Sequence, residues 1–238
     1  VSRDHTERML IGAGIDLDIE DDKIRLKKSQ HRKLNPFNIK VPGDISSAAF
    51  FITAALIAEE GELLIENVGI NHTRSGFLEV VEAMGGDIEL LNKKEEGGEP
   101  TADILVRPSK LHGTEVGGEI IPRLIDEIPI ISVLAAFAEG ETVIRDAEEL
   151  RVKETDRIAA VAVEFEKLGI EIEEYEDGLV IPGSEEVESG IKVKSYHDHR
   201  IAMSLAVLGL RTQKGLTIEG SEIINTSFPG FNELLQSI

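Results

Sequence analysis

A repeated layout constrains the fold of this 238-residue chain more than any other feature of its sequence. In three segments, an Ala-rich apolar stretch is followed by a glycine, a short β-branched run, a loop and an amphipathic stretch. The first two segments continue through a second glycine, Gly85 or Gly169, into two further β-type runs. Such a repeat predicts an α+β fold (α/β repeats) of β-α-β-α-β-β units, with buried helices gathered under sheets.

The Ala-rich stretches predict buried helices, because they are apolar nearly all round. They cover residues 48–58, 128–138 and 201–210. In the amphipathic stretch that begins near residue 153, apolar residues at positions 158, 161, 165 and 168 recur at helical spacing. The opposite, solvent-facing side of that helix is expected to carry Glu164, Glu166 and Lys167.

The β-branched runs predict short strands. Three of them follow the Ala-rich helices, at residues 61–68, 141–147 and 215–220. Residues 170–176 and 178–181 predict a hairpin, because an Asp-Gly pair marks a turn at residues 176–178.

The first part of the chain does not contain a whole unit. Residues 1–39 predict only the tail of one, a helix followed by a hairpin with its turn at Asp21 and Asp22. We therefore expect residues 1–39 to be the tail of an N-terminal lobe. Residues 40–238 are expected to form a C-terminal lobe of three units that lacks its first N-terminal strand. A chain that opens on the last helix of a repeat is expected to be a piece of a longer protein.

Composition excludes several functions. The chain carries 45 acidic and 25 basic residues, a formal charge of −20, which argues against binding to nucleic acid or an anionic membrane. No apolar run approaches a membrane span and no signal-peptide pattern is present. The absence of cysteine is typical of a reducing compartment, so we expect a cytoplasmic protein. Nucleotide-fold and hydrolase motifs are also absent.

The densest charge pattern lies at residues 150–161, LRVKETDRIAAV. On a helix that starts near Lys153, the side chains of Lys153, Glu154 and Arg157 share one face. One interpretation is a surface ion pair between Glu154 and Arg157. However, cations are disfavoured at a helix N-terminus, and Lys153 and Arg157 repel each other unless an anion lies between them. The alternative interpretation is an anion site.

A second pattern, HDHR, precedes the third Ala-rich helix. His197 and His199 diverge if they lie on a helix, and a third ligand is missing, so we expect no metal site. Asp198 is a candidate N-cap. The other interpretation is an anion site that uses Arg200 and His199.

Two further helix starts carry carboxylates. Asp126 and Glu127 interrupt an apolar run just before the second Ala-rich helix, as N-caps or as a candidate acid/base. Asp44 occupies the same place in the first segment, where we expect an N-cap, with Ser46 and Ser47 as small packing residues.

These stretches resemble a known family. RVKETDRIAAVAVEFEKLG, HDHRIAMSLAVLGL, GDISSAA, IPRLIDEIP and TSFPGF together resemble the bacterial EPSP synthases. The resemblance covers essentially the whole chain and implies an enolpyruvyl transferase-like lobe, with the active site in a cleft between two lobes. It implies transfer of the enolpyruvyl group of phosphoenolpyruvate (PEP) to the 5-hydroxyl of shikimate 3-phosphate, in the shikimate pathway of aromatic amino-acid biosynthesis. No cofactor and no metal are implied.

The resemblance also assigns roles to residues. The catalytic residues are expected to be Asp126, Glu154 and Lys153. Shikimate 3-phosphate is expected to contact Ser2, Arg3, Asp126 and Lys153.

For PEP, the implied contacts are Arg157, Arg200, Glu154 and His199. The partners implied are the two anionic substrates and the missing N-terminal portion of the same enzyme, which is expected to be a monomer when complete.

Two other functions stay open on the sequence alone. The chain could be an inactive folded fragment that acts only as a partner-binding module for the missing portion. It could also be a sister enolpyruvyl transferase that acts on a UDP-sugar.

Overall fold

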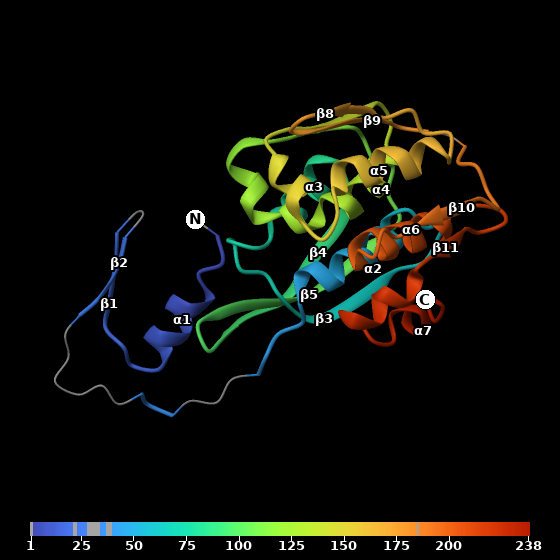
Figure 1. Ribbon diagram of the computed structural model, residues 1–238. Coiled ribbons are helices and arrows are strands. Elements are labelled where there is room, and N and C mark those ends of the chain that lie inside the picture. The colour runs from blue at the N-terminus through green and yellow to red at the C-terminus, as the bar shows by residue number, and fades with distance from the viewer. Residues whose placement is uncertain (1, 21–22, 28–33, 37–39, 185) are drawn as a thin grey trace.

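The computed structural model describes residues 2–20, 23–27, 34–36, 40–184 and 186–238. Three sheets surround a central group of helices, and the first part of the chain lies to one side of this body (Figure 1). The predicted α+β architecture of repeated units is confirmed, and the units differ in how many of their strands are present.

Among its described residues, the segment at the side contains one helix and one antiparallel pair of strands. Helix α1 spans His5–Gly12, and strands β1 (Leu17–Glu20) and β2 (Lys23–Leu26) pair antiparallel. The expected turn at Asp21 and Asp22 lies outside the described residues.

The first unit has a three-stranded antiparallel sheet in the order β3-β5-β4. Its elements are α2 (Ile45–Leu56), β3 (Leu63–Gly69), α3 (Gly76–Ala83), β4 (Asp87–Glu96) and β5 (Glu99–Arg107). An isolated parallel bridge joins Gly43 to Val68, at the edge where a preceding strand of the unit would pair.

The second unit has all six elements. They are β6 (Glu115–Val116), α4 (Ile128–Ala136), β7 (Glu141–Ile144), α5 (Arg157–Glu166), β8 (Glu173–Tyr175) and β9 (Gly178–Pro182). The sheet order is β6-β7-β9-β8, with β6 and β7 parallel and the other pairs antiparallel. The predicted hairpin at β8 and β9 is confirmed, because Tyr175 pairs with Gly178. Short 3₁₀ helices lie at Gly118–Arg123, Ile125–Glu127 and Glu148–Val152.

The third unit repeats the first part of this pattern. Its elements are β10 (Lys192–Lys194), α6 (His199–Gly209), β11 (Thr217–Glu219), a 3₁₀ helix at Ser221–Thr226 and α7 (Phe231–Leu235). Strands β10 and β11 pair parallel, as β6 and β7 do. Within residues 186–238, no closing hairpin follows α7.

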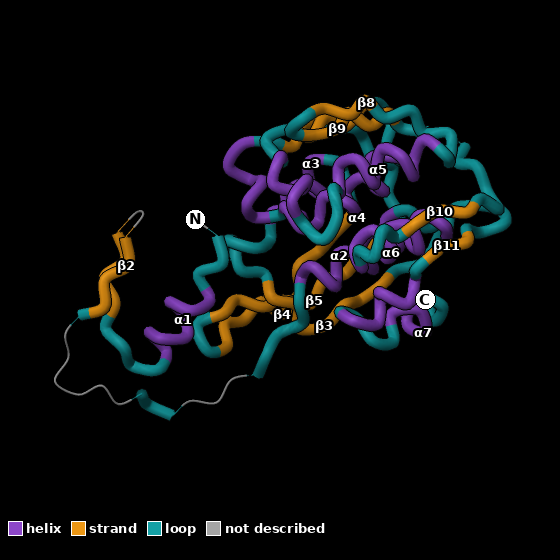
Figure 2. The backbone as a smooth tube through the Cα atoms, in the orientation of Figure 1, coloured by secondary structure: helices purple, strands orange, loops and turns teal. Residues whose placement is uncertain are grey.

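The three Ala-rich helices α2, α4 and α6 pack against one another in the core, as the tube view shows (Figure 2). Every residue of α4 is buried, and the prediction of buried helices is therefore confirmed. Burying an Ile or Leu side chain contributes about 1.5–3 kcal/mol, so this apolar centre is the main source of stability. At the end of the core, ring contacts join Phe50 and Phe51 of α2 to Phe231 of α7.

Two local predictions are wrong. Helix α5 begins at Arg157 rather than near Lys153, because the Asp156 carboxylate caps it by accepting the Ala159 N–H at 3.0 Å. Lys153 lies in the turn before the helix. Glu164, expected on the solvent face, is fully buried, because the chain just before α6 packs over it.

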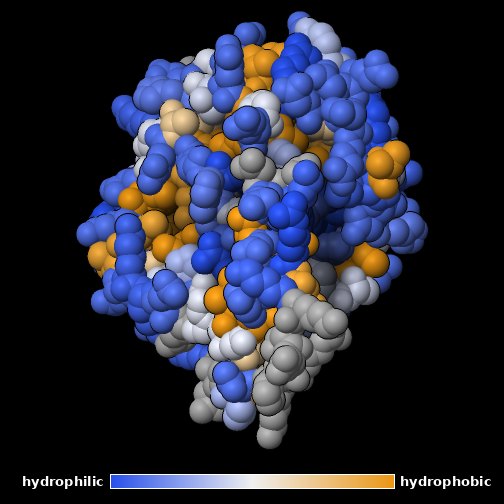
Figure 3. Space-filling view, turned by 90° about the vertical axis from the view of Figure 1, so that its left-hand side faces the viewer, coloured by the Kyte–Doolittle hydropathy of each residue, from blue (hydrophilic) through white to orange (hydrophobic). Residues whose placement is uncertain are grey.

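One face of the surface is largely hydrophilic (Figure 3). On the face turned toward α1, polar and charged side chains dominate, with apolar patches between them (Figure 3). Within the described ranges, no helix is both long enough and apolar enough to span a bilayer.

Candidate active site

The predicted site residues lie at the starts of helices that are far apart in the sequence. Asp126 precedes α4, Arg157 opens α5, and Arg200 lies in the first turn of α6. Because these three helices pack side by side with their starts together, the residues converge in space. Hydrogen bonds link Arg157 and Arg200 to Asp126.

Asp126 is the centre of this cluster. One carboxylate oxygen lies 2.9 Å from Arg3 Nη2 and 3.9 Å from Arg74 Nη1. The other lies 3.3 Å from Arg157 Nη1 and 3.8 Å from Lys153 Nζ. Four cations from three segments thus surround one carboxylate.

These cations control the protonation of Asp126. Burial raises the pKa of the Asp126 carboxyl, but the charges of Arg200, Lys153, Arg157 and Arg3 outweigh burial and hold the pKa below its ordinary value. Asp126 is therefore ionised at neutral pH, and it neutralises part of the surrounding positive charge.

Arg157 is the most buried of the cations, with only 1% of its side chain exposed. Its Nε donates to Asp198 at 2.8 Å, and its Nη2 donates to Glu154 at 2.7 Å. The ion pair between Glu154 and Arg157 exists, but the surface interpretation of it is wrong. Glu154 is half exposed, whereas the guanidinium lies inside the protein.

Asp198 has two roles. Its carboxylate caps α6 by accepting the N–H groups of Arg200 at 2.8 Å and Ile201 at 3.3 Å, which confirms the capping interpretation. The same carboxylate pairs with Arg157 and is fully buried. His197 lies outside the helix, whereas His199 is its first residue. Among the described residues, no group of three His, Cys, Asp or Glu side chains could hold a metal ion.

Arg200 and His199 line a small polar cavity beside the N-terminus of α2. Arg200 Nη1 donates to the backbone oxygen of Asp126 at 3.1 Å and lies 3.5 Å from Glu127. Burial lowers the pKa of the His199 imidazole, and the neighbouring Arg200 charge adds to the effect. His199 is therefore neutral at pH 7 and can offer a hydrogen bond rather than a charge.

Sequence reasoning missed a buried network next to Asp126. Arg74 donates to Ser46 Oγ at 2.6 Å, and Ser46 donates to Glu127 Oε1 at 2.5 Å. Ser46 is thus more than a small packing residue. Glu127 does not cap α4: its carboxyl is buried, its Oε2 has no hydrogen-bond partner among the described residues, and burial raises its pKa.

A sequence signal for Arg74 did exist. Arg74 stands just before α3, as Arg157 and Arg200 stand at the starts of α5 and α6. Because an arginine recurs at a helix start, the pattern predicts that the three arginine side chains lie on the same side of the protein.

At the N-terminal end of the chain, only one of the two predicted residues joins the cluster. Arg3 reaches Asp126 across 123 positions of sequence. Ser2 is exposed and forms no side-chain hydrogen bond within the described ranges. Lys153 pairs with Glu149 at 2.8 Å and keeps its ammonium within 4 Å of Asp126.

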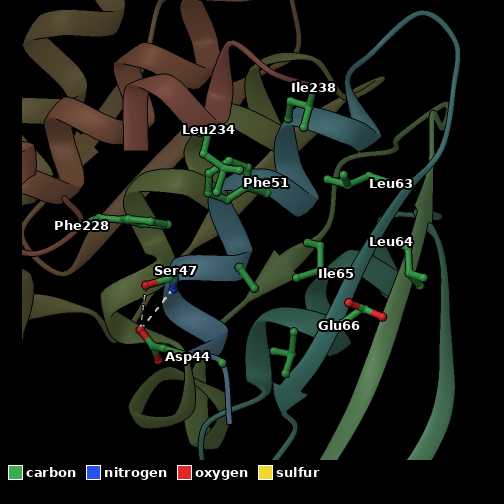
Figure 4. A pocket seen from close by; sticks show the side chains of 13 residues that line it. Asp44, Ser47, Phe51, Leu63, Leu64, Ile65, Glu66, Phe228, Leu234 and Ile238 are labelled. Atoms are coloured by element: carbon green, nitrogen blue, oxygen red, sulfur yellow. Dashed lines mark hydrogen bonds between the residues drawn. The ribbon is translucent and has the colours of Figure 1, made fainter. Parts of the chain in front are cut away.

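A separate groove lies between α2, β3 and α7 (Figure 4). Its lining is mostly apolar, including Phe51, Leu63 and Phe228, and the Asp44 carboxylate at its edge accepts hydrogen bonds from Ser47. Asp44 caps α2, as predicted. The groove lacks the cation cluster, so the candidate active site is at Asp126.

Comparison with known proteins points to one family. The model of the family EPSP synthase (3-phosphoshikimate 1-carboxyvinyltransferase) matches residues 1–235. The 3-phosphoshikimate 1-carboxyvinyltransferases of Geotalea daltonii and Geobacter sulfurreducens are 51% and 52% identical over 238 residues. Each match covers 100% of this chain and 55% of the relative. The chain therefore spans about half the length of these relatives.

Solved structures agree. An EPSP synthase from Acinetobacter baumannii, 44% identical, matches with a TM-score of 0.92 over 100% of this chain and 54% of that one. The enolpyruvyl transferase NikO from Streptomyces tendae shares the fold, with a TM-score of 0.72 at 20% identity over 96% of this chain and 50% of that one. The resemblance noted in the sequence is thus confirmed, and the chain belongs to the EPSP synthase family.

Proposed function

We propose that this chain is the C-terminal portion of a 3-phosphoshikimate 1-carboxyvinyltransferase. The reaction transfers the enolpyruvyl group of PEP to the 5-hydroxyl of shikimate 3-phosphate and yields EPSP and phosphate. One observation carries the proposal: in a protein of charge −20, Arg3, Arg74, Lys153 and Arg157 gather within 4 Å of Asp126. Such a local concentration of cations suits two substrates that each carry several negative charges.

Shikimate 3-phosphate is assigned to the side of the cluster formed by Ser2, Arg3, Asp126 and Lys153. Arg3 and Lys153 are the more exposed cations, with 43% and 22% of their side chains accessible. They can turn from Asp126 to a substrate oxyanion at little cost. Asp126 then accepts a hydrogen bond from the 5-hydroxyl.

PEP is assigned to Arg157, Arg200, Glu154 and His199. A planar guanidinium can bind a carboxylate or phosphate through two parallel hydrogen bonds, which an ammonium cannot. The Nη atoms of Arg157 are held by Glu154 and Asp126, so an oxyanion of PEP can replace those carboxylates. Nε keeps its bond to Asp198, and the arginine stays anchored.

The proposed chemistry has two steps. In the first, the 5-hydroxyl oxygen forms a bond to C2 of PEP, its proton passes to Asp126, and C3 gains a proton from Glu154, which enters the step protonated once PEP has replaced it at Arg157. In the second, Glu154 takes a proton back from C3, the bond between C2 and the phosphate oxygen breaks, and phosphate leaves with the proton that Asp126 held. The carboxylates Asp126 and Glu154 flank Arg157, where the tetrahedral intermediate would lie. Lys153 stabilises the developing negative charge.

The domain arrangement belongs to the same proposal. Residues 1–39 are taken as the tail of the N-terminal, shikimate 3-phosphate-binding lobe, and residues 40–238 as the C-terminal lobe. The missing N-terminal portion of the enzyme is the partner that completes both sites. The complete enzyme is proposed to be a cytoplasmic monomer.

A chimera tests this function. The part of the Geobacter sulfurreducens relative that this chain does not match is placed before residue 1, and phosphate release is measured with PEP and shikimate 3-phosphate. We expect turnover with shikimate 3-phosphate and none with a UDP-sugar acceptor. Turnover with the UDP-sugar as acceptor, and none with shikimate 3-phosphate, would contradict the proposal.

The partner-binding alternative needs a second measurement, because the chain spans about half of its relatives. The chain is mixed with the separately made N-terminal part, and binding and phosphate release are both followed. Binding without turnover, together with an inactive chimera, would identify a partner-binding module. We expect phosphate release from the mixture and none from the chain alone.

A further inference from the structure

Glu164 is a fully buried carboxylate that the proposed chemistry does not use. It lies on α5 seven residues after Arg157, so both side chains project from the same face of the helix, two turns apart. Both contact the segment of chain at residues 194–198, which leads into α6.

Both carboxylate oxygens of Glu164 accept hydrogen bonds. Oε1 accepts the Tyr196 hydroxyl at 2.6 Å, and Oε2 accepts the backbone N–H of Lys194 at 3.0 Å. Lys167 Nζ lies 2.7 Å from both oxygens. Burial raises the pKa of Tyr196 to about 12, and Glu164 adds to the effect, so the hydroxyl keeps its proton and remains a donor. A carboxylate is buried at high cost, and this one is retained with every oxygen satisfied.

The segment that Glu164 holds has a strained backbone. Tyr196 and His197 have φ values of +53° and +58°, a region that residues other than glycine rarely adopt, and never cheaply twice in succession. Such a conformation persists where the surroundings fix it. Glu164 fixes the segment from α5, and Ser195 Oγ fixes it from within by donating to Gly220 O and accepting from His197 N.

Asp198 follows the strained pair directly. Its carboxylate pairs with Arg157 and caps the helix that carries His199 and Arg200. The contacts therefore close a ring: α5 is joined to residues 194–198 at Arg157 and again at Glu164. A shift of Tyr196 would rotate Asp198 and move both arginine-bearing helix starts.

We propose that Glu164 is a positioning residue for anion binding, acting through Tyr196 and Asp198 to hold Arg157 in its binding orientation. The proposal rests on the proposed function, since it names what orders the arginines assigned to PEP. Glu164 itself does not touch the substrate.

The first test uses this chain and needs no activity. The exchange rate of the Arg157 Nε proton with water is measured by nitrogen-15 NMR in the natural protein and in Glu164→Gln, Tyr196→Phe and Glu166→Gln. We expect at least tenfold faster exchange in the first two variants, because Asp198 no longer holds Nε. Glu166 is an exposed residue of the same helix, and its variant should match the natural protein.

Unchanged exchange in Glu164→Gln and Tyr196→Phe, with only a lower melting temperature, would overturn the proposal and leave Glu164 a purely structural residue. Tyr196→Phe keeps the ring and the other bonds of Glu164, so it decides the matter if Glu164→Gln does not fold.

The second test measures kinetics in the chimera. Tyr196→Phe should raise KM for PEP at least tenfold and leave KM for shikimate 3-phosphate unchanged. Equal changes in both KM values would contradict a specific role toward the arginines. If the chimera is inactive, the proposed function has failed, and the NMR result still decides the role of Glu164.

Discussion

Arg157 and Asp198 form a buried ion pair that joins the first turns of two helices. The Nε to Oδ2 distance is 2.8 Å, and the two side chains are 1% and 0% exposed. Since Asp198 also caps α6, one carboxylate fixes the start of a helix and the orientation of the arginine next to it. The proposed anion site and the fold therefore depend on the same contact.

Replacing Asp198 by Asn separates these roles, because Asn caps a helix about as well as Asp but carries no charge. The buried guanidinium then loses its partner, and we expect a loss of about 3–5 kcal/mol in the free energy of unfolding. Urea denaturation of the chain measures it. The matched control is Asp44→Asn at the exposed cap of α2, which should cost less than about 0.5 kcal/mol. A similar loss of unfolding free energy in both variants would mean that Asp198 stabilises the protein by capping α6 and not through the ion pair.

Glu127 predicts a pH dependence of stability. Burial raises the pKa of its carboxyl in the folded state, so the folded protein holds this proton more tightly than the unfolded chain. The stabilisation is complete below the ordinary pKa near 4.5 and is lost as the pH rises through the folded-state pKa. Glu127→Gln, which cannot ionise, should therefore lose less stability than the natural protein between pH 5 and pH 8.

Urea denaturation at both pH values gives this difference, with Glu66→Gln on the exposed side of β3 as the control. The control should follow the natural protein. Parallel losses in Glu127→Gln and the natural protein would show that Glu127 is ionised throughout the range.

Local patterns predicted much of this structure. The Ala-rich helices and the caps Asp44 and Asp198 follow from periodicity and residue type within a few positions. The dense charges near residue 153 predict a helix start at Lys153, which is wrong. Asp156, just before the apolar run, is a standard N-cap signal and lies at the observed start of α5. The N-cap signal that marks the start of α5 is thus present in the sequence itself.

Other features required the tertiary structure. Glu164 lies three residues after Val161 and four before Leu168, at the edge of the apolar stripe, and the packing of residues 194–196 against α5 buries it. The contact between Arg3 and Asp126 joins positions 123 residues apart, which no spacing pattern encodes. Arg74 and Glu127 are linked through Ser46 by the meeting of two units.

Glu154 should be important for catalysis and unimportant for stability. Its side chain is 48% exposed, so the ion pair with Arg157 contributes less than about 1 kcal/mol. In the chimera, Glu154→Gln should lower kcat by roughly 10²–10⁴, the usual value of a general acid or base. Rapid-quench measurement of phosphate release tests it, with Glu166→Gln as the control. A normal kcat would mean that the proton at C3 is handled by another group.

Arg200→Lys and Arg157→Lys should separate binding from folding. Each variant keeps the positive charge but loses the planar fork, so PEP binding to the chimera should weaken about 10- to 150-fold, the equivalent of roughly 1.5–3 kcal/mol for a hydrogen bond to a charged group. Only Arg157→Lys should also destabilise the protein, because one ammonium cannot reach Asp198, Glu154 and Asp126 together.

Calorimetric titration with PEP in the presence of shikimate 3-phosphate measures binding, and urea denaturation measures stability. If Arg157→Lys unfolds normally while PEP binding is unchanged, the buried arginine has no role in the anion site; if Arg200→Lys binds PEP normally, the second arginine has none.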